Sequence, residues 1–156
     1  MKLGFTGIRE RARKYKQFHI ENGSITNEMS AIFEGVEIEY TAIISFVERL
    51  YSVILNRKAD NAGKASWVTA ITSGATAYDV AHGFVFSPEF TGKNVSNTEF
   101  VRTLYKTVLD REPDAAGLNA WVGELNKGYS REQVFAGIVK SPEFVTLAAS
   151  YGMRAY

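Results

Sequence analysis

The 156-residue chain contains no cysteine. This absence excludes disulfide frameworks, thiolate zinc sites and cysteine nucleophiles together. It does not decide the cellular compartment, because a secreted helical domain of this size needs no disulfide. Stability has to come from an apolar core. The 46% hydrophobic and 13% aromatic content is enough for one good core, or for two small cores that share an interface.

Histidine is also scarce, with only His19 and His82 in the whole chain. Neither has a second histidine at metal-ligand spacing, and no nucleophile elbow, phosphate loop or dinucleotide fingerprint occurs. Glu89 and Glu143 resemble the carboxylate pair of a glycosidase, but both belong to a repeated helix-start motif that already explains them. We therefore expect a protein that is not an enzyme and that uses no cofactor.

The chain has no long apolar run and no excess of one charge. No stretch approaches the about 18 apolar residues of a membrane span, and the start "MKLGFTGIRERARKYK" has no apolar signal-peptide core. Eighteen basic against seventeen acidic residues give a net charge of +1, so the whole molecule lacks the basic surface typical of nucleic-acid-binding proteins. We expect no membrane span and no nucleic-acid partner.

The strongest positive signal is an internal repeat. Residues 46–90 align without a gap with residues 100–144 at a fixed offset of 54, with 19 identities in 45 positions. The shared frame runs "FVxxLYxxxLxR", "DxAGxxxWV" and "VxxGxVxSPEF". Since both copies lie in one chain, the alignment shows directly which positions both keep.

The repeated frame predicts helices. Apolar residues of its first segment recur at i, i+3 and i+4, which indicates an amphipathic helix ending near Arg57 in the first copy and Arg111 in the second. Asp60 and Asp114 are placed to cap the next helix, and the "SP" of "SPEF" is typical of a helix start. No segment alternates with period two. We predict an all-α fold of two tandem helical repeats with three to four short helices each.

The first forty residues lie outside the two copies. Residues 1–20 carry six basic and one acidic residue, a balance of +5, whereas residues 21–40 carry five acidic residues and no base, a balance of −5. With the turn signal "ENGS" between them, we predict a helical hairpin whose arms neutralise each other. The alternative is a basic helix that binds nucleic acid or an acidic surface. The predicted domains are the hairpin at 1–40, repeat 1 at 41–93, and repeat 2 with a C-terminal tail at 94–156. The stretch "TNEMSAIFEGVEIEY" also faintly resembles the third-helix part of the repeats, as a decayed partial repeat would.

The stretches "FVERLYSVILNRKADNAGKASWV", "NTEFVRTLYKTVLDREPDAAGLNAWV" and "SREQVFAGIVKSPEF" resemble the bacterial modules called domain of unknown function 4214. The resemblance covers about residues 45–156. It implies an accessory module of a secreted or cell-surface protein, with no established activity. The family often has an aromatic residue just before the tryptophan position, where this chain has Ser66 and Ala120.

The acidic corner between the first two helices invites comparison with a calcium loop. An EF-hand needs oxygen ligands at alternating positions and a bidentate glutamate at the twelfth, and "DREPDAAGLNAW" has Trp121 in that place. We expect no metal. A structural corner explains the residues that both copies keep, which are Arg57, Asp60, Gly63, Arg111, Asp114 and Gly117.

The two corner arginines have two interpretations. The first is an ion pair with the glutamate of "SPEF", Glu89 or Glu143, that fastens the corner to the next helix junction. The second is an anchor for a ligand carboxylate or phosphate. We favour the structural interpretation.

The repeated aromatic residues are candidates for ligand contact. Flat aromatic faces stack on sugar rings, and Trp67 and Trp121, with Tyr51 and Tyr105, recur in both copies. Each tryptophan stands on the apolar side of a short helix, where core packing is the ordinary fate. Core packing is therefore the first interpretation and a sugar platform the second.

Phe86 is a candidate for contact outside its own repeat. It is the third hydrophobic residue in a row, after Phe84 and Val85, and one helix cannot bury all three on a single stripe. The hypothesis from sequence is a non-catalytic accessory module of an exported bacterial protein that binds or attaches to a surface glycan or protein. The alternative is an assembly module that self-associates or docks on its parent protein. A binding surface is expected where the copies disagree, at the pairs Asn56 and Asp110, Lys58 and Glu112, and Lys64 and Leu118.

Overall fold

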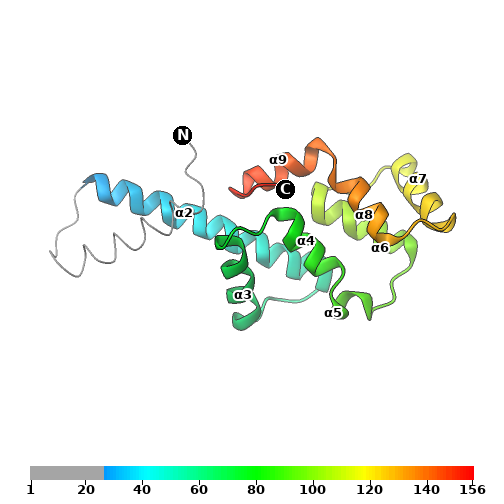
Figure 1. Ribbon diagram of the computed structural model, residues 1–156, viewed down its shortest axis with the longest axis horizontal. Helices are drawn as coiled ribbons and strands as arrows, with labels where there is room; N and C mark the ends of the chain where they lie inside the picture. The colour runs from blue at the N-terminus through cyan, green and yellow to red at the C-terminus, as the bar shows by residue number, and fades with distance from the viewer. Residues whose placement is uncertain (1–26) are drawn as a thin grey trace.

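The computed structural model describes residues 27–156, and these are helical with no strand (Figure 1). The first arm of the predicted hairpin lies outside the described residues. The helices, including two five-residue π-helical turns written η, are α2 Asn27–Leu50, η1 Tyr51–Leu55, α3 Asn61–Thr72, α4 Ala77–Val85, α5 Pro88–Thr91, α6 Asn97–Leu104, η2 Tyr105–Leu109, α7 Ala115–Asn126, α8 Arg131–Val139 and α9 Pro142–Ser150. The predicted all-α fold with two tandem helical repeats is confirmed.

Each repeat uses the same succession of elements. The first helix ends in a π turn, a short helix follows after the corner, a third helix crosses back, and a serine-proline step opens the fourth. Each π turn is closed by a residue in the left-handed region, Asn56 and Asp110, both with φ of 55°. Asparagine and aspartate are the residues besides glycine that adopt this conformation most readily. The difference between the copies at this position therefore keeps a backbone requirement while it changes the charge.

Side-chain caps set the helix starts where the sequence predicts them. Asp60 accepts a hydrogen bond from the amide of Gly63 at 2.7 Å, and Asp114 accepts one from that of Gly117 at 2.6 Å. Thr76 and Ser130 open α4 and α8 with reciprocal capping boxes, and Ser87 and Ser141 precede the prolines of α5 and α9. The caps predicted at Asp60, Asp114 and the two "SP" steps are confirmed. All of these caps satisfy amide groups that a helix start otherwise leaves without an intrahelical partner.

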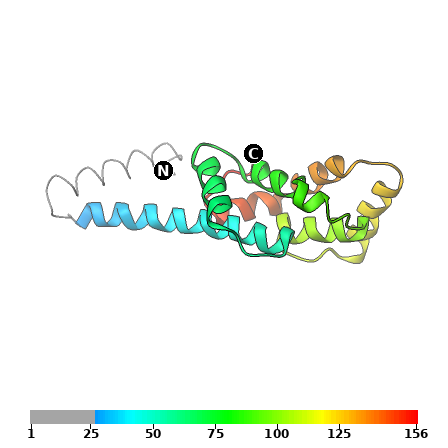
Figure 2. The ribbon, with the colours of Figure 1, turned by 90° about the horizontal axis from the view of Figure 1, so that it is seen from below.

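The long helix α2 enters the first repeat without a break. Its 24 residues run through position 40, where the sequence suggested the end of the hairpin. At the offset of 54, the Ser87 and Pro88 that start α5 correspond to Phe33 and Glu34 in α2. Without proline, nothing at that point removes a backbone hydrogen bond or forces a helix boundary. In both views the N-terminal half of α2 extends away from the other labelled helices (Figure 2).

One continuous core runs through both repeats. Its largest fully buried side chains come from each copy in turn, and they include Phe46, Leu50, Phe84, Phe100, Leu104, Phe135 and Phe144. The apolar faces predicted by the helical spacing are the faces that the structure buries. Burial of such side chains stabilises a fold by about 1.5–3 kcal/mol each, so the two repeats stabilise each other as one unit.

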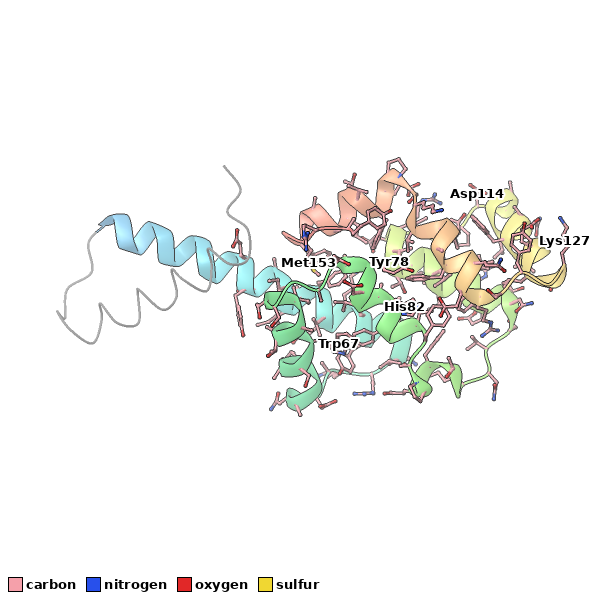
Figure 3. The ribbon with its side chains drawn as sticks, in the orientation of Figure 1. Trp67, Tyr78, His82, Asp114, Lys127 and Met153 are labelled. Carbon is pink, nitrogen blue, oxygen red and sulfur yellow. The ribbon has the colours of Figure 1, made fainter. Side chains whose placement is uncertain are left out.

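The third helices of the two repeats meet around Phe135 of α8. Three rings of the first repeat lie close to it, with centroid distances of 5.3 Å for Tyr78 and 5.6 Å for His82 in α4, and 5.7 Å for Phe86 at the end of α4. Figure 3 labels Tyr78 and His82. His82 Nε2 also lies 2.9 Å from a carboxylate oxygen of Glu132 on α8. Phe86 therefore does make a contact outside its own repeat, and that contact is with the second repeat of the same chain.

The C-terminal tail returns to the first repeat. The carbonyls of Arg154 and Ala155 accept hydrogen bonds from the amides of Ala77 and Tyr78, at 2.9 and 3.0 Å. These amides belong to the first turn of α4, where the backbone donors have no partner within the helix. The tail thus completes the start of α4 and joins the second repeat to the first.

Two cations satisfy the carbonyl groups at the ends of the π turns. Arg49 of α2 donates to the carbonyl of Thr107 at 2.6 Å, to that of Lys106 and to the Asp110 carboxylate at 2.8 Å. Lys93, in the linker after α5, donates to the carbonyl of Leu55 at 2.7 Å. The last carbonyls of a helix need such external donors, and here each donor comes from a distant segment of the chain.

Candidate functional site: the repeated corner and the groove beside it

Each corner is fastened by a bidentate ion pair. Arg57 Nε and Nη2 donate to the two carboxylate oxygens of Glu89 at 2.6 and 2.9 Å, and Arg111 does the same to Glu143 at 2.7 and 2.9 Å. The ion pair predicted for each arginine is present. Because a carboxylate of the protein already fills the fork of each guanidinium, neither arginine presents it to a ligand.

The repeated tyrosines lie beneath these arginines. The guanidinium carbon of Arg57 is 4.8 Å from the ring centroid of Tyr51, and that of Arg111 is 5.1 Å from Tyr105, which is cation–π geometry. Tyr51 is 4% exposed and Tyr105 is 7% exposed. Both rings are part of the core, so neither offers a face on which a sugar could stack.

The glycines of the corner make room for the tyrosine hydroxyls. A Cβ atom on Gly63 would lie 2.1 Å from Tyr51 Oη, and one on Gly117 would lie 2.7 Å from Tyr105 Oη. Both separations are below van der Waals contact. The kept glycine of each corner is therefore a packing requirement between the first and second helices of a repeat.

Each tryptophan packs against a glycine of the third helix. A Cβ atom added to Gly83 would lie 2.4 Å from Trp67 Cη2, and one added to Gly137 would lie 2.5 Å from Trp121 Cη2. Trp67 also stacks on Phe84 with a centroid distance of 4.9 Å. Both indoles are half-buried, with one edge inside their own repeat (Figure 3 labels Trp67). These contacts account for the tryptophans by packing alone.

Three carboxylates at the corners, those of Glu89, Glu143 and Asp60, have lowered pKa values that favour their charged form. The Arg57 guanidinium lowers the pKa of Glu89, and Arg111 lowers the pKa of Glu143. Hydrogen bonding from the first turn of α3, assisted by Arg57, lowers the pKa of Asp60. In residues 27–156 no group of three or more histidine, cysteine, aspartate or glutamate side chains gathers as a metal site would require.

A groove of about 620 Å³ opens beside the corner of the first repeat. We call it the first-repeat groove. It is lined by Glu48 and Ser52 from α2 and η1, by the corner residues, and by the start of α3; the remaining lining residues are Asn56, Arg57, Lys58, Ala59 and Lys64. Its size falls in the range of small-ligand sites, roughly 300–1,000 Å³.

The charges of the groove are reversed at the same place in the second repeat. In the first repeat the acidic residue is Glu48 of α2, and Lys64 Nζ of α3 lies 2.9 Å from its carboxylate. In the second repeat the corner supplies the acid, Glu112, which lies 2.7 Å from Lys106 and 3.5 Å from Arg102. Of the seven groove positions only that of Arg57 has the same residue in both copies. The frame is shared, and the surface over it is not.

The chain contains two matches to one family model. The family described as domain of unknown function (DUF4214) matches residues 29–94 and again residues 83–148. The chain belongs to this family. The second DUF4214 match starts 54 residues after the first, the same offset as the internal repeat. The first starts within α2, inside the segment that resembles a third helix. Neither the curated proteins nor the solved structures gave a match.

Three groove residues of this DUF4214 chain, Glu48, Ser52 and Ala59, were not singled out from sequence. Glu48 and Ser52 lie on the predicted first helix, which was interpreted by its apolar face alone. The signal was nevertheless available: Glu48 corresponds to Arg102 and Lys58 to Glu112, so both charges change sign together. Paired reversals of this kind indicate that two positions are close in space.

Across the described part of the chain, no helix is long and apolar enough to cross a membrane.

Proposed function

We propose that this DUF4214 chain is a non-catalytic binding module of an exported bacterial protein. In this proposal the two repeats form a helical frame, and the first-repeat groove contacts a cell-surface glycan or protein. A secreted or cell-surface location is part of the proposal and rests on the resemblance to modules of exported proteins.

The proposal rests on a difference between the residues that both repeats keep, which make internal contacts, and the residues that differ, which line a groove. The kept residues of the corner are used in internal contacts, as the Arg57–Glu89 ion pair and the Gly63–Tyr51 packing show. A groove lies directly beside them and is lined by residues that differ between the copies. Folding accounts for the first set and leaves the second unexplained, so the second set is where we place binding.

Self-association is not favoured by the packing of Phe86. This residue suggested assembly because its own helix cannot bury it, but Phe135 of the second repeat packs against it in the same chain. The binding proposal therefore stands without an assembly step.

The test uses the second repeat as a template for the first. The groove variant Glu48→Arg, Ser52→Lys, Lys58→Glu and Lys64→Leu copies the residues found at the corresponding positions of the second repeat. The copied set brings the ion pairs that Glu112 makes in the second repeat, so the variant is expected to fold. Each of the four surface changes is expected to alter stability by no more than about 0.5 kcal/mol. Cosedimentation with isolated bacterial cell envelopes is then measured for both proteins.

Wild-type chain is expected to sediment with the envelopes, and the groove variant is expected to lose at least about tenfold in affinity, or about 1.4 kcal/mol. Equal binding of the two proteins would show that the groove is not the site. Absence of wild-type binding to the envelopes, to their extracted glycans and to their extracted proteins would show that the proposed function is wrong.

A further inference from the structure

We propose that the first-repeat groove takes an anionic saccharide and that Lys58 contacts its carboxylate or phosphate group. This inference rests on the proposed binding function and names the chemical class of the ligand.

The lining of the groove includes one basic side chain that no ion pair neutralises. Three of its lining residues are basic and one is acidic, but two of the three basic side chains have acidic partners. Arg57 is paired with Glu89, and Lys64 is paired with Glu48. Among the residues that the structure describes, Lys58 has no ion-pair partner, although the corresponding Glu112 of the second repeat has two. An unpaired cation at the edge of a polar groove attracts an anion.

The remaining groove residues suit a ligand rich in hydroxyl groups. The hydroxyl of Ser52 and the amide of Asn56 can both donate and accept hydrogen bonds, and the Glu48 carboxylate accepts them. Sugar hydroxyls have the same double capacity. A lysine ammonium is a compact charge with three donors on a flexible stem, so it accommodates a carboxylate or a phosphate without requiring a planar pair.

The same set of residues disfavours a peptide ligand. Protein interfaces obtain most of their affinity from aromatic and large apolar anchors that fill pockets. The lining of this groove contains no aromatic residue and no aliphatic side chain larger than that of Ala59. A ligand that binds here has to do so by charge and hydrogen bonds, which describes an acidic sugar better than a peptide segment.

The test compares an acidic saccharide with its neutral ester, and adds two other anionic polymers that have different backbones. Calorimetric titrations of the full chain use oligogalacturonate, its methyl ester as the matched neutral form, oligo(glycerol phosphate) for the phosphate source, and oligoglutamate for an acidic peptide. We expect oligogalacturonate or oligo(glycerol phosphate) to bind, and the methyl ester to bind at least about tenfold more weakly than the acid. We also expect the affinity for the acidic probe to fall as salt is raised from about 50 to about 500 mM.

Separate substitutions of a basic and of an acidic groove residue sharpen the test. Lys58→Gln is expected to weaken binding of the acidic probe about three- to tenfold, and Glu48→Gln to strengthen it about twofold because Lys64 is released from its ion pair. Lys140→Gln is the matched control, since it removes an exposed lysine outside the groove lining. It is expected to leave the affinity unchanged.

Each contrary result has a distinct meaning. Equal binding of oligogalacturonate and its methyl ester, or no effect of Lys58→Gln, would overturn the anionic ligand and leave the proposed binding function in place. Equal or tighter binding of oligoglutamate would overturn the saccharide. If no probe binds while the chain still sediments with envelopes through the groove, the inference is wrong and the function stands. If envelope binding fails too, both are wrong.

Discussion

The two repeats of this DUF4214 chain follow the same path and carry different surfaces. Arg57 and Arg111 are fastened to glutamates in the same bidentate way, and the same π turn precedes each of them. Beside them the charges are opposite, with an acid on the helix of the first repeat and an acid in the corner of the second. Within one chain, the comparison separates residues that fold the repeat from residues that are free to acquire another role.

The repeats also differ at their ends. The first is entered by the 24-residue α2, and the second by the eight-residue α6. The fourth helix has four residues in the first repeat and nine in the second. These differences teach that the chain is not an open array of equal units: α2 and the C-terminal tail are particular to their own ends, and the tail packs back on α4.

The largest effect is expected at the junction of the two repeats. Phe135→Ala removes a ring with no exposed surface that meets Tyr78, His82 and Phe86 of the other repeat. We expect a loss of about 3–5 kcal/mol in the free energy of unfolding, the usual cost of removing a buried phenylalanine ring. Urea denaturation followed by circular dichroism measures it. If the repeats are one unit, a single transition shifts as a whole, and a variant with two separate transitions would contradict this.

A smaller loss of stability is expected from substituting the corner glycines, and this loss is expected to be larger in the first repeat than in the second. Gly63→Ala places a Cβ 2.1 Å from Tyr51 Oη, whereas Gly117→Ala places one 2.7 Å from Tyr105 Oη. Overpacking costs about 1–3 kcal/mol and outweighs the gain of up to about 1 kcal/mol from alanine in a helix. Thermal unfolding should therefore show destabilisation by both changes, with the larger effect at Gly63.

The control for this ranking removes the hydroxyl instead of the glycine. Adding Tyr51→Phe to Gly63→Ala takes away the atom that the new methyl group meets, so the double variant is expected to recover part of the lost stability. If the two changes add without any coupling, the close approach between Gly63 and Tyr51 is not the cause of the loss.

The smallest effect is expected from acid acting on the two ion pairs. Arginine lowers the pKa of both Glu89 and Glu143, so their contribution to stability is present above the ordinary glutamate pKa of about 4.3 and is lost as the pH falls through the lowered values. We expect the urea midpoint of wild type to fall more between pH 6 and pH 2 than that of the double variant Glu89→Gln, Glu143→Gln. Parallel curves for the two proteins would contradict this, and an unequal loss in the single variants would show which corner depends more on its ion pair.

Much of the frame was predictable because its determinants are local or repeated. Asp60 caps a helix through an amide three residues away, and the partner Glu89 of Arg57 belongs to a motif that recurs at the same spacing in the second copy. The groove was predicted in kind, as a surface where the copies disagree, but not in its full lining. Glu48 of α2 is 16 residues from Lys64 of α3 in the sequence, and the two side chains meet only because of how these helices pack.

The sequence by itself determined the helical class, the two-fold repetition, the helix caps and the corner ion pairs, because each is a hydrogen bond within a few residues or a pattern written twice. Only the tertiary structure decided that Phe86 packs on the second repeat, that Arg49 reaches the carbonyl of Thr107 at a separation of 58 residues, and that the tail completes α4. These contacts join residues far apart in the chain, and their partners are mostly backbone groups, which every residue carries and which no sequence pattern distinguishes.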